Sequence, residues 1–329
     1  MKNKIKILAR ILFGGLILFG LFFKIGFDKI VESLAHLNLW ALPLAVGFFV
    51  IFLGLSSLGS WVLLRAFSPL SFREFLPCYF PSWAIGLFLP GKLGEVSIVY
   101  YLKKRDIAVG QGTAFFVTGK TVTVFALGMI ASTGFFTFFS FWVAVQLFLL
   151  LVAVLGGFVF FLLSAFGQKI IRKILPEKTR ERFAGFFSAF SSYFRKHRGL
   201  LVVSLGIKLL GFGSIALMNY FIFSVGLNVR ILVFKILQIS TMETFSALIP
   251  ISVNGLGIRQ AMGIYLYGLL GVNAPIVASS QIVGWVLIYL FGVIIFIWPR
   301  PSLLPSRDGP LEEPREDRPS PSSSLQDLP

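Results

Sequence analysis

Two short stretches place charged and helix-breaking residues inside otherwise apolar sequence. The first reads Leu-Pro-Gly-Lys-Leu-Gly-Glu over residues 89–95, and the second reads Ile-Pro-Ile-Ser-Val-Asn-Gly-Leu-Gly-Ile-Arg-Gln over residues 249–260. A helix that begins at such a break presents free N–H groups and the positive end of its dipole. Each break also has a basic side chain close by, Lys92 in the first and Arg259 in the second. The pattern therefore predicts an anion-binding site.

The candidate binding residues are those at the two breaks and charges in the neighbouring apolar segments. Charges in a membrane-spanning segment are costly and usually functional. We expect Lys92 and Arg259 to bind a phosphate headgroup rather than hairpin carbonyls. We expect Glu95 and Glu243 to pair with these cations rather than act as catalytic acids. The full set is Pro90, Gly91, Lys92, Gly94, Glu95, Lys120, Glu243, Asn254, Gly255, Gly257 and Arg259.

Three of the polar residues have a second interpretation. Lys120 lies in the middle of an apolar run, where it either joins the site or pairs with Glu95 or Glu243. Lys208 lies nearer the end of a run, so it either joins the site or extends to the membrane surface. Asn254 is more suited to stabilising the turn before Gly255 than to contacting a ligand.

The composition indicates what must hold these residues in place. The 329 residues are 56% hydrophobic and 13% charged, with a mean hydropathy of +0.86. Soluble domains carry about 25% charged residues. Several apolar runs approach the roughly 20 residues that cross a bilayer, which predicts an all-α polytopic membrane protein. The net charge of +16 fits loops facing anionic lipid better than nucleic acid.

The chain offers little for metal, cofactor or catalytic chemistry. Cys78 is the single cysteine, and the two histidines, His36 and His197, lie far apart in the sequence. No sequence pattern of a metal site, a nucleotide-binding loop or a hydrolase nucleophile is present. We expect no cofactor, no metal and no enzymatic activity.

The apolar runs predict about six full spans and two interrupted segments. The spans are residues 5–23, 40–64, 109–132, 141–165, 200–225 and 274–298, and the interrupted segments are residues 74–102 and 231–271. Basic residues favour the cytoplasmic side, so both termini are expected to lie there. If the basic loops all lie on the cytoplasmic side, each interrupted segment must enter and leave the membrane on the same side, as a re-entrant hairpin. The two hairpins then have opposite orientations. Residues 40–132 and 200–298 would then form two inverted repeats.

Two further regions are expected around these repeats. Residues 166–199 are basic and carry phenylalanines at helical spacing, which predicts a cytoplasmic amphipathic linker; a solvated loop explains part of the same pattern. Residues 299–329 are rich in proline, serine and acidic residues and are expected to be a disordered tail beyond a domain at 1–298.

These motifs resemble those of the lysylphosphatidylglycerol synthase transmembrane (flippase-like) family, which includes the membrane half of the bacterial multiple peptide resistance factor. The family's Pro-Gly-Arg-x-Gly-Glu motif corresponds to residues 90–95, with Lys92 in place of arginine. Its Pro-Ile-Ser-x-x-Gly-Leu-Gly-x-Arg-Glu motif corresponds to residues 250–260, with Gln260 in place of glutamate. A Glu-Arg pair expected in the following span is Gly119-Lys120 here.

The resemblance covers roughly residues 5–298 and implies a two-repeat helical fold that moves lipid between leaflets. A soluble synthase domain has no counterpart in this sequence, so lipid synthesis is not implied. The first hypothesis is therefore a lipid flippase or transporter of the cell (inner) membrane, which binds an anionic phospholipid or polyprenyl phosphate between the hairpin tips. The alternative is a non-catalytic membrane subunit or scaffold for a separate lipid- or glycan-modifying enzyme. Besides membrane lipids, the expected partner is such an enzyme or a second copy of the chain in a homo-oligomer. A transferase would need acidic residues in an outer loop, where only Asp28 and Glu32 qualify.

Overall fold

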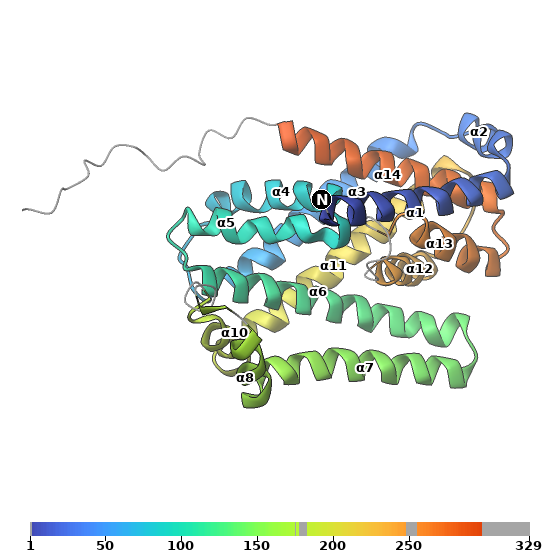
Figure 1. Ribbon diagram of the computed structural model, residues 1–329. Helices are drawn as coiled ribbons and strands as arrows, with labels where there is room; N and C mark the ends of the chain where they lie inside the picture. The colour runs from blue at the N-terminus through green and yellow to red at the C-terminus, as the bar shows by residue number, and fades with distance from the viewer. Residues whose placement is uncertain (1, 175, 178–182, 248–254, 298–329) are drawn as a thin grey trace, which may run out of the picture.

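Helices form every secondary-structure element in the part of the chain that is described (Figure 1). The computed structural model describes residues 2–174, 176–177, 183–247 and 255–297, with side chains outside 2–13, 90–92 and 172. The expected tail at 299–329 lies outside the described residues, as does Asn254.

Five helices are long and apolar enough to cross a membrane, which makes the chain a multi-pass membrane protein. They coincide with five of the six expected spans. The first expected span is also helical, as α1 (Lys2–Ile25), but the total number of spans stays a prediction. The five are α3 (Ala41–Leu64), α6 (Val109–Phe138), α7 (Phe141–Leu163), α11 (Arg198–Phe221) with its π-helical extension η2 (Ile222–Gly226), and α14 (Ala274–Ile297).

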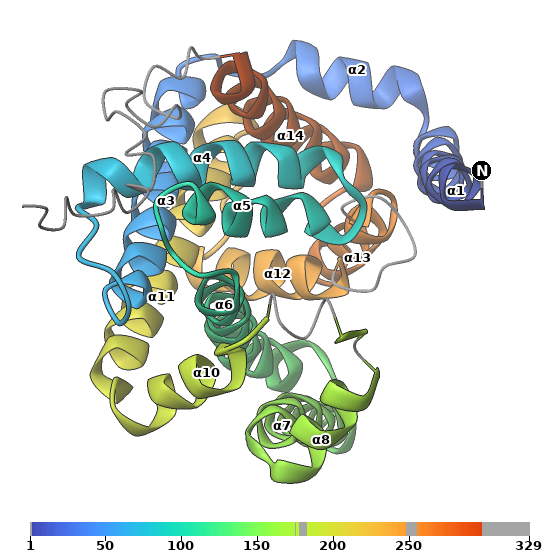
Figure 2. The same ribbon diagram turned by 60° about the vertical axis from the view of Figure 1, so that its left-hand side comes forward.

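The first interrupted segment is a helical hairpin. It consists of α4 (Phe72–Phe88), a 3₁₀-helix η1 (Pro90–Val96) and α5 (Ser97–Lys103), and α4 and α5 lie side by side (Figure 2). Leu89 is extended because a following proline disfavours the helical conformation. At 17 residues, α4 is about 25 Å long, shorter than the roughly 30 Å hydrocarbon core. The break lies where the sequence predicts it, and the re-entrant path through the membrane stays a prediction.

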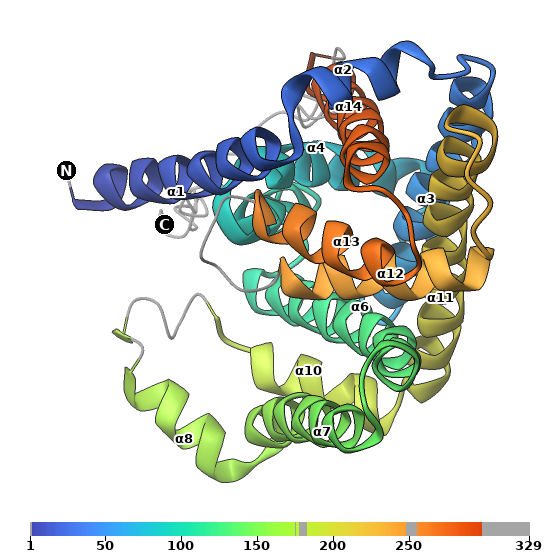
Figure 3. The ribbon, with the colours of Figure 1, turned by 90° about the vertical axis from the view of Figure 1, so that its right-hand side faces the viewer.

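The second interrupted segment also forms two short adjacent helices, α12 (Val233–Ser246) and α13 (Ile258–Leu269) (Figure 3). Gly257 precedes α13 with a φ of 84°, and a Cβ there would lie 2.7 Å from Cβ of Ile17 in α1. Glycine is therefore required by both the backbone conformation and the close approach of α1. The Gly257 N–H donates to Oε1 of Gln260 at 2.7 Å, which satisfies one free donor at the helix start.

The long helices α3 and α11 pack against each other along their length and form one side of the molecule (Figure 3). Gly59 of α3 contacts the Ser204–Lys208 turn of α11, and Gly211 of α11 contacts Leu55, so the two helices run antiparallel. Hairpin helix α4 packs on α14, and hairpin helix α12 packs on α6. Each hairpin thus packs against the last span of the other predicted repeat. The inverted relation of the repeats stays a prediction.

The remaining helices pack around these elements. α2 (Phe27–Ala35) connects α1 to α3 and packs on α14, where Ser279 Oγ donates to the Ile30 carbonyl at 3.2 Å. α7 runs along α6 (Figure 1). The basic stretch contains α8 (Ala165–Ile174) and α10 (Phe186–Arg195).

The phenylalanine pattern in the basic stretch is largely explained by packing against the protein. Phe190 and Tyr193 of α10 are fully buried, and Tyr193 Oη donates to the Leu63 carbonyl at 2.9 Å. α10 therefore attaches to α3 and α6. The cytoplasmic location of this stretch stays a prediction.

Candidate functional site

A cavity of about 420 Å³ lies between the two hairpins and the long helices. Residues of η1, α4, α5, α12 and α13 line it, together with residues of spans α3, α6, α11 and α14. In the part of the chain that is described, its charged lining consists of Glu95, Lys120, Lys208 and Arg259. The structure therefore brings charges from both predicted motifs into one cavity. The sequence does not reveal this proximity, because the two motifs lie more than 100 residues apart.

The first charged group in the cavity is an ion pair between η1 and α6. Lys120 Nζ donates a hydrogen bond to Glu95 Oε2, and the Lys120 ammonium also lies 5.7 Å from the centre of the Phe116 ring. Close packing inside the hairpin places Glu95: a Cβ on Gly94 would lie 2.7 Å from the backbone nitrogen of Gly86. The sequence leaves open whether Lys120 joins the site or pairs with a carboxylate. The structure shows both, since Lys120 pairs with Glu95 and also lines the cavity.

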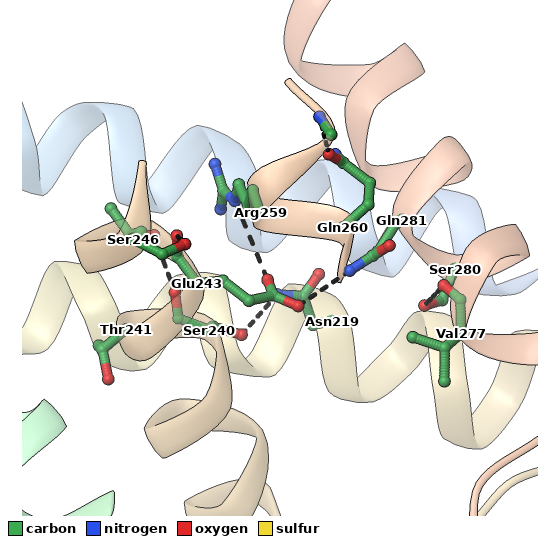
Figure 4. Close-up of polar contacts among 12 residues, drawn as sticks. Asn219, Ser240, Thr241, Glu243, Ser246, Arg259, Gln260, Val277, Ser280 and Gln281 are labelled. Atoms are coloured by element: carbon green, nitrogen blue, oxygen red, sulfur yellow. Dashed lines mark hydrogen bonds and ion pairs between the residues drawn. The ribbon is translucent and has the colours of Figure 1, made fainter. Parts of the chain in front are cut away.

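The second charged group connects α12, α13 and α14 (Figure 4). Arg259 Nε lies 3.9 Å from Glu243 Oε2, and Gln281 Nε2 donates to Glu243 Oε1 at 2.9 Å. Glu243 is only 6% exposed and does not line the cavity, whereas Arg259 does. Glu243 therefore pairs with the Arg259 guanidinium on the side away from the cavity. This pairing is the role that the sequence predicts for Glu243.

Hydroxyl groups and aromatic rings form much of the remaining wall. Ser56 Oγ and Tyr79 Oη are hydrogen-bonded at 2.8 Å, and Ser60 lies one helical turn from Ser56 on α3. The apolar part of the wall includes Phe49, Phe52, Trp83, Phe212 and Trp285. The cavity thus combines a few polar groups with extensive apolar surface, as small-molecule sites commonly do.

Lys208 is a cavity residue that the sequence left undecided. It lies near the middle of the 24-residue α11, is 8% exposed, and its Cγ packs beside Gly59 of α3. In the described part of the chain, no group forms a hydrogen bond or ion pair with its ammonium. The sequence signal was the lysine itself in an apolar run, but only the α3–α11 packing shows which way it faces.

The other predicted residues divide between the two hairpin tips. Pro90, Gly91 and Lys92 lie in η1, where the Lys92 side chain is outside the described part, so its anion-binding role stays a prediction. Gly255 and Gly257 both have positive φ angles at the start of α13. Among the described residues, no three histidine, cysteine or acidic side chains are grouped as a metal site would require.

Comparison with known proteins gives one family. The model of the family described as "Lysylphosphatidylglycerol synthase TM region" matches residues 7–296. No curated protein matches the chain.

Proposed function

The chain belongs to the lysylphosphatidylglycerol synthase TM region family, and on that premise we propose that it is a lipid transporter of the cell (inner) membrane. In this proposal the cavity between the hairpins binds an anionic lipid headgroup, and the chain carries no catalytic residue. The observation that supports it is the convergence of Lys120, Lys208 and Arg259 on one cavity of about 420 Å³.

The physical reason is the cost of charge in an apolar environment. Cations inside membrane segments are rare and usually pair or bind charged ligands. Among the described residues, two carboxylates accompany the three cations, Glu95 in the lining and Glu243 behind it. An anionic headgroup would supply the missing negative charge. The aromatic and aliphatic wall would accommodate the parts of the lipid next to its phosphate.

The proposed transport step uses the two hairpins as opposing gates. Broken helices at the interface of two repeats are the usual place for transporter sites, and alternating access is largely the movement of one repeat against the other. Here α4 packs on α14, and α12 packs on α6. A hairpin that moves would therefore slide against a helix of the other repeat. The acyl chains would stay in the bilayer while the headgroup crosses.

The proposed topology has both termini in the cytoplasm and the two hairpins entering from opposite sides. It can be tested by cysteine labelling, since the single native cysteine, Cys78, is buried. Lys104 and Arg230 are both exposed and lie in loops on opposite sides of this topology. In intact cells, an impermeant maleimide should label Arg230→Cys and spare Lys104→Cys until the cells are opened. The reverse pattern would invert the orientation.

The function can be tested with the purified protein in sealed vesicles that contain fluorescent phosphatidylglycerol. Transport makes the labelled lipid of the inner leaflet accessible to an external quencher. We expect the double variant Lys120→Met and Arg259→Met to slow transport by about tenfold or more, since each change removes a charged contact with the headgroup. Because the loss of Arg259 should also destabilise the protein, only folded, monodisperse protein is reconstituted, in the same amount as the wild type. Lys173→Met, an exposed change on α8, is the matched control.

Transport that is equal in wild type and the double variant would show that the cavity charges do not act on the lipid. Wild-type vesicles without transport, together with a stoichiometric enzyme partner on purification, would favour the scaffold alternative. Transport by the protein alone would exclude a role that is only that of a scaffold.

A further inference from the structure

The balance of charges in the cavity points to one side chain in particular. Lys120 is held by Glu95, and Arg259 is held by Glu243. Lys208 lines the same cavity and is nearly as buried as Glu243, yet it has no such partner within the described residues. The described charges at the cavity are therefore three cations and two carboxylates, an excess of one positive charge.

A buried and unpaired ammonium is expensive to keep. Removing a charge from water in a protein interior costs several kcal/mol unless a partner compensates it. Lys208 also lies within electrostatic reach of Lys120, a like charge, which adds to this cost, while Glu95 offsets only part of it. A ligand that brings a negative charge to Lys208 would relieve the cost, so the structure favours an anion there.

On the basis of the proposed function, we propose that Lys208 supplies the charge that binds the anion, beside the paired cations Lys120 and Arg259. We also propose that the site takes a lipid with a singly charged phosphodiester in preference to a doubly charged phosphate monoester. A phosphodiester carries one negative charge, which matches the excess of one positive charge among the described residues of the cavity. A phosphate monoester carries about −1.5 to −2 at pH 7. Its second charge would be left without a partner unless it displaced Glu95 or Glu243.

The rest of the wall fits the headgroup of a phospholipid. The Ser56–Tyr79 hydroxyl pair and Ser60 lie on the same cavity and can exchange hydrogen bonds with hydroxyls beyond the phosphodiester. Phe52 and Trp285 offer apolar surface to the glycerol and upper acyl region of a lipid. A free phosphodiester would use the polar groups and leave this apolar surface without a partner.

The test measures binding by the full-length protein in detergent micelles at pH 7.5. The probes are phosphatidylglycerol and phosphatidic acid, each with a fluorescent label on one acyl chain. We expect the wild type to bind phosphatidylglycerol about tenfold more tightly than phosphatidic acid, since the second charge is not matched. We expect Lys208→Met to weaken phosphatidylglycerol binding by about 10- to 100-fold and Lys208→Arg by about threefold or less.

Two controls separate binding from a structural role. Lys173→Met on α8 removes an exposed lysine and should change neither affinity. Lys208→Met and Lys208→Gln should keep the unfolding temperature at or above that of the wild type, because each removes an unpaired buried charge. A lower unfolding temperature in both neutral variants would assign Lys208 a structural role and overturn the proposal.

The remaining outcomes also decide the question. Equal or tighter binding of phosphatidic acid would overturn the charge match, and unchanged phosphatidylglycerol binding by Lys208→Met would overturn the role of Lys208. Glycerophosphoglycerol has the same headgroup without acyl chains and should not compete at concentrations where the lipid does. Equal competition would assign the site to a soluble phosphodiester. Binding as expected without vesicle transport would leave this inference intact and refute transport alone.

Discussion

The ion pair between Arg259 and Glu243 provides the sharpest prediction for the second hairpin. We expect Arg259→Met alone to destabilise the protein strongly, because it leaves the Glu243 carboxylate buried with the Gln281 amide as its remaining partner among the described residues. Glu243→Gln alone should cost less, since Arg259 is the more exposed member and also faces the cavity. The double variant should be more stable than the sum of the two single changes predicts.

The magnitude follows from the distance between the charges. At 3.9 Å and an effective dielectric constant near 20, the Coulomb energy is about 4 kcal/mol. Removing one partner of a buried pair typically costs about 3–5 kcal/mol. The Arg259 side chain is 22% exposed, so water weakens the pair somewhat. We therefore expect a coupling energy of about 2–4 kcal/mol between the two positions.

The assay is reversible unfolding in mixed detergent micelles, measured for the wild type, both single variants and the double variant. Lys235→Met is the control, because Lys235 contacts the Phe138 ring and is absent from the cavity lining. A coupling energy below about 0.5 kcal/mol would refute the reasoning, since distant independent sites already add within that range.

Three further changes test the site and the packing around it. Glu95→Gln should shift the lipid preference towards phosphatidic acid by severalfold, since it frees a second positive charge; an unchanged preference in the micelle assay would contradict the charge balance. Gly94→Ala should destabilise the protein by about 1–3 kcal/mol in unfolding titrations, because its Cβ would meet the Ile85 carbonyl; unchanged stability would contradict the close approach. Tyr193→Phe should lower the free energy of unfolding by about 1 kcal/mol, measured by thermal unfolding, since it removes the hydrogen bond to the Leu63 carbonyl. An unchanged free energy of unfolding would show that this bond does not stabilise the protein.

The spans could be predicted from the sequence because their apolar runs have the length of the bilayer core. Their ends were less accurate. The span predicted to end at residue 132 continues to Phe138, because the hydroxyls of Thr133 and Thr137 bond back to carbonyls one turn earlier and remain in the helix. The hairpin breaks could be predicted because proline and glycine leave a local signal. The number of spans and the inverted relation of the repeats depend on how the helices lie in the membrane. No short stretch of the sequence determines that placement.

The candidate site could be predicted only as two separate motifs. Sequence reasoning offers Lys120 two partners, and the choice of Glu95 depends on how the first hairpin packs on α6 through α5. It left Lys208 undecided because its direction is set by the contact between α11 and Gly59 of α3, almost 150 residues away. Likewise, the pattern in α10 predicts an apolar helix face but does not reveal that α3 and α6 cover it.

The central claim is that an anionic lipid headgroup lies between the two hairpins. The most direct test is photocrosslinking with phosphatidylglycerol that carries a diazirine in its headgroup, followed by mass spectrometry of the peptides. The account predicts adducts on cavity residues of both hairpins, such as Leu93 and Leu256, and their loss in Lys208→Met. Adducts confined to the exposed outer face of α7, with the same pattern in Lys208→Met, would contradict it.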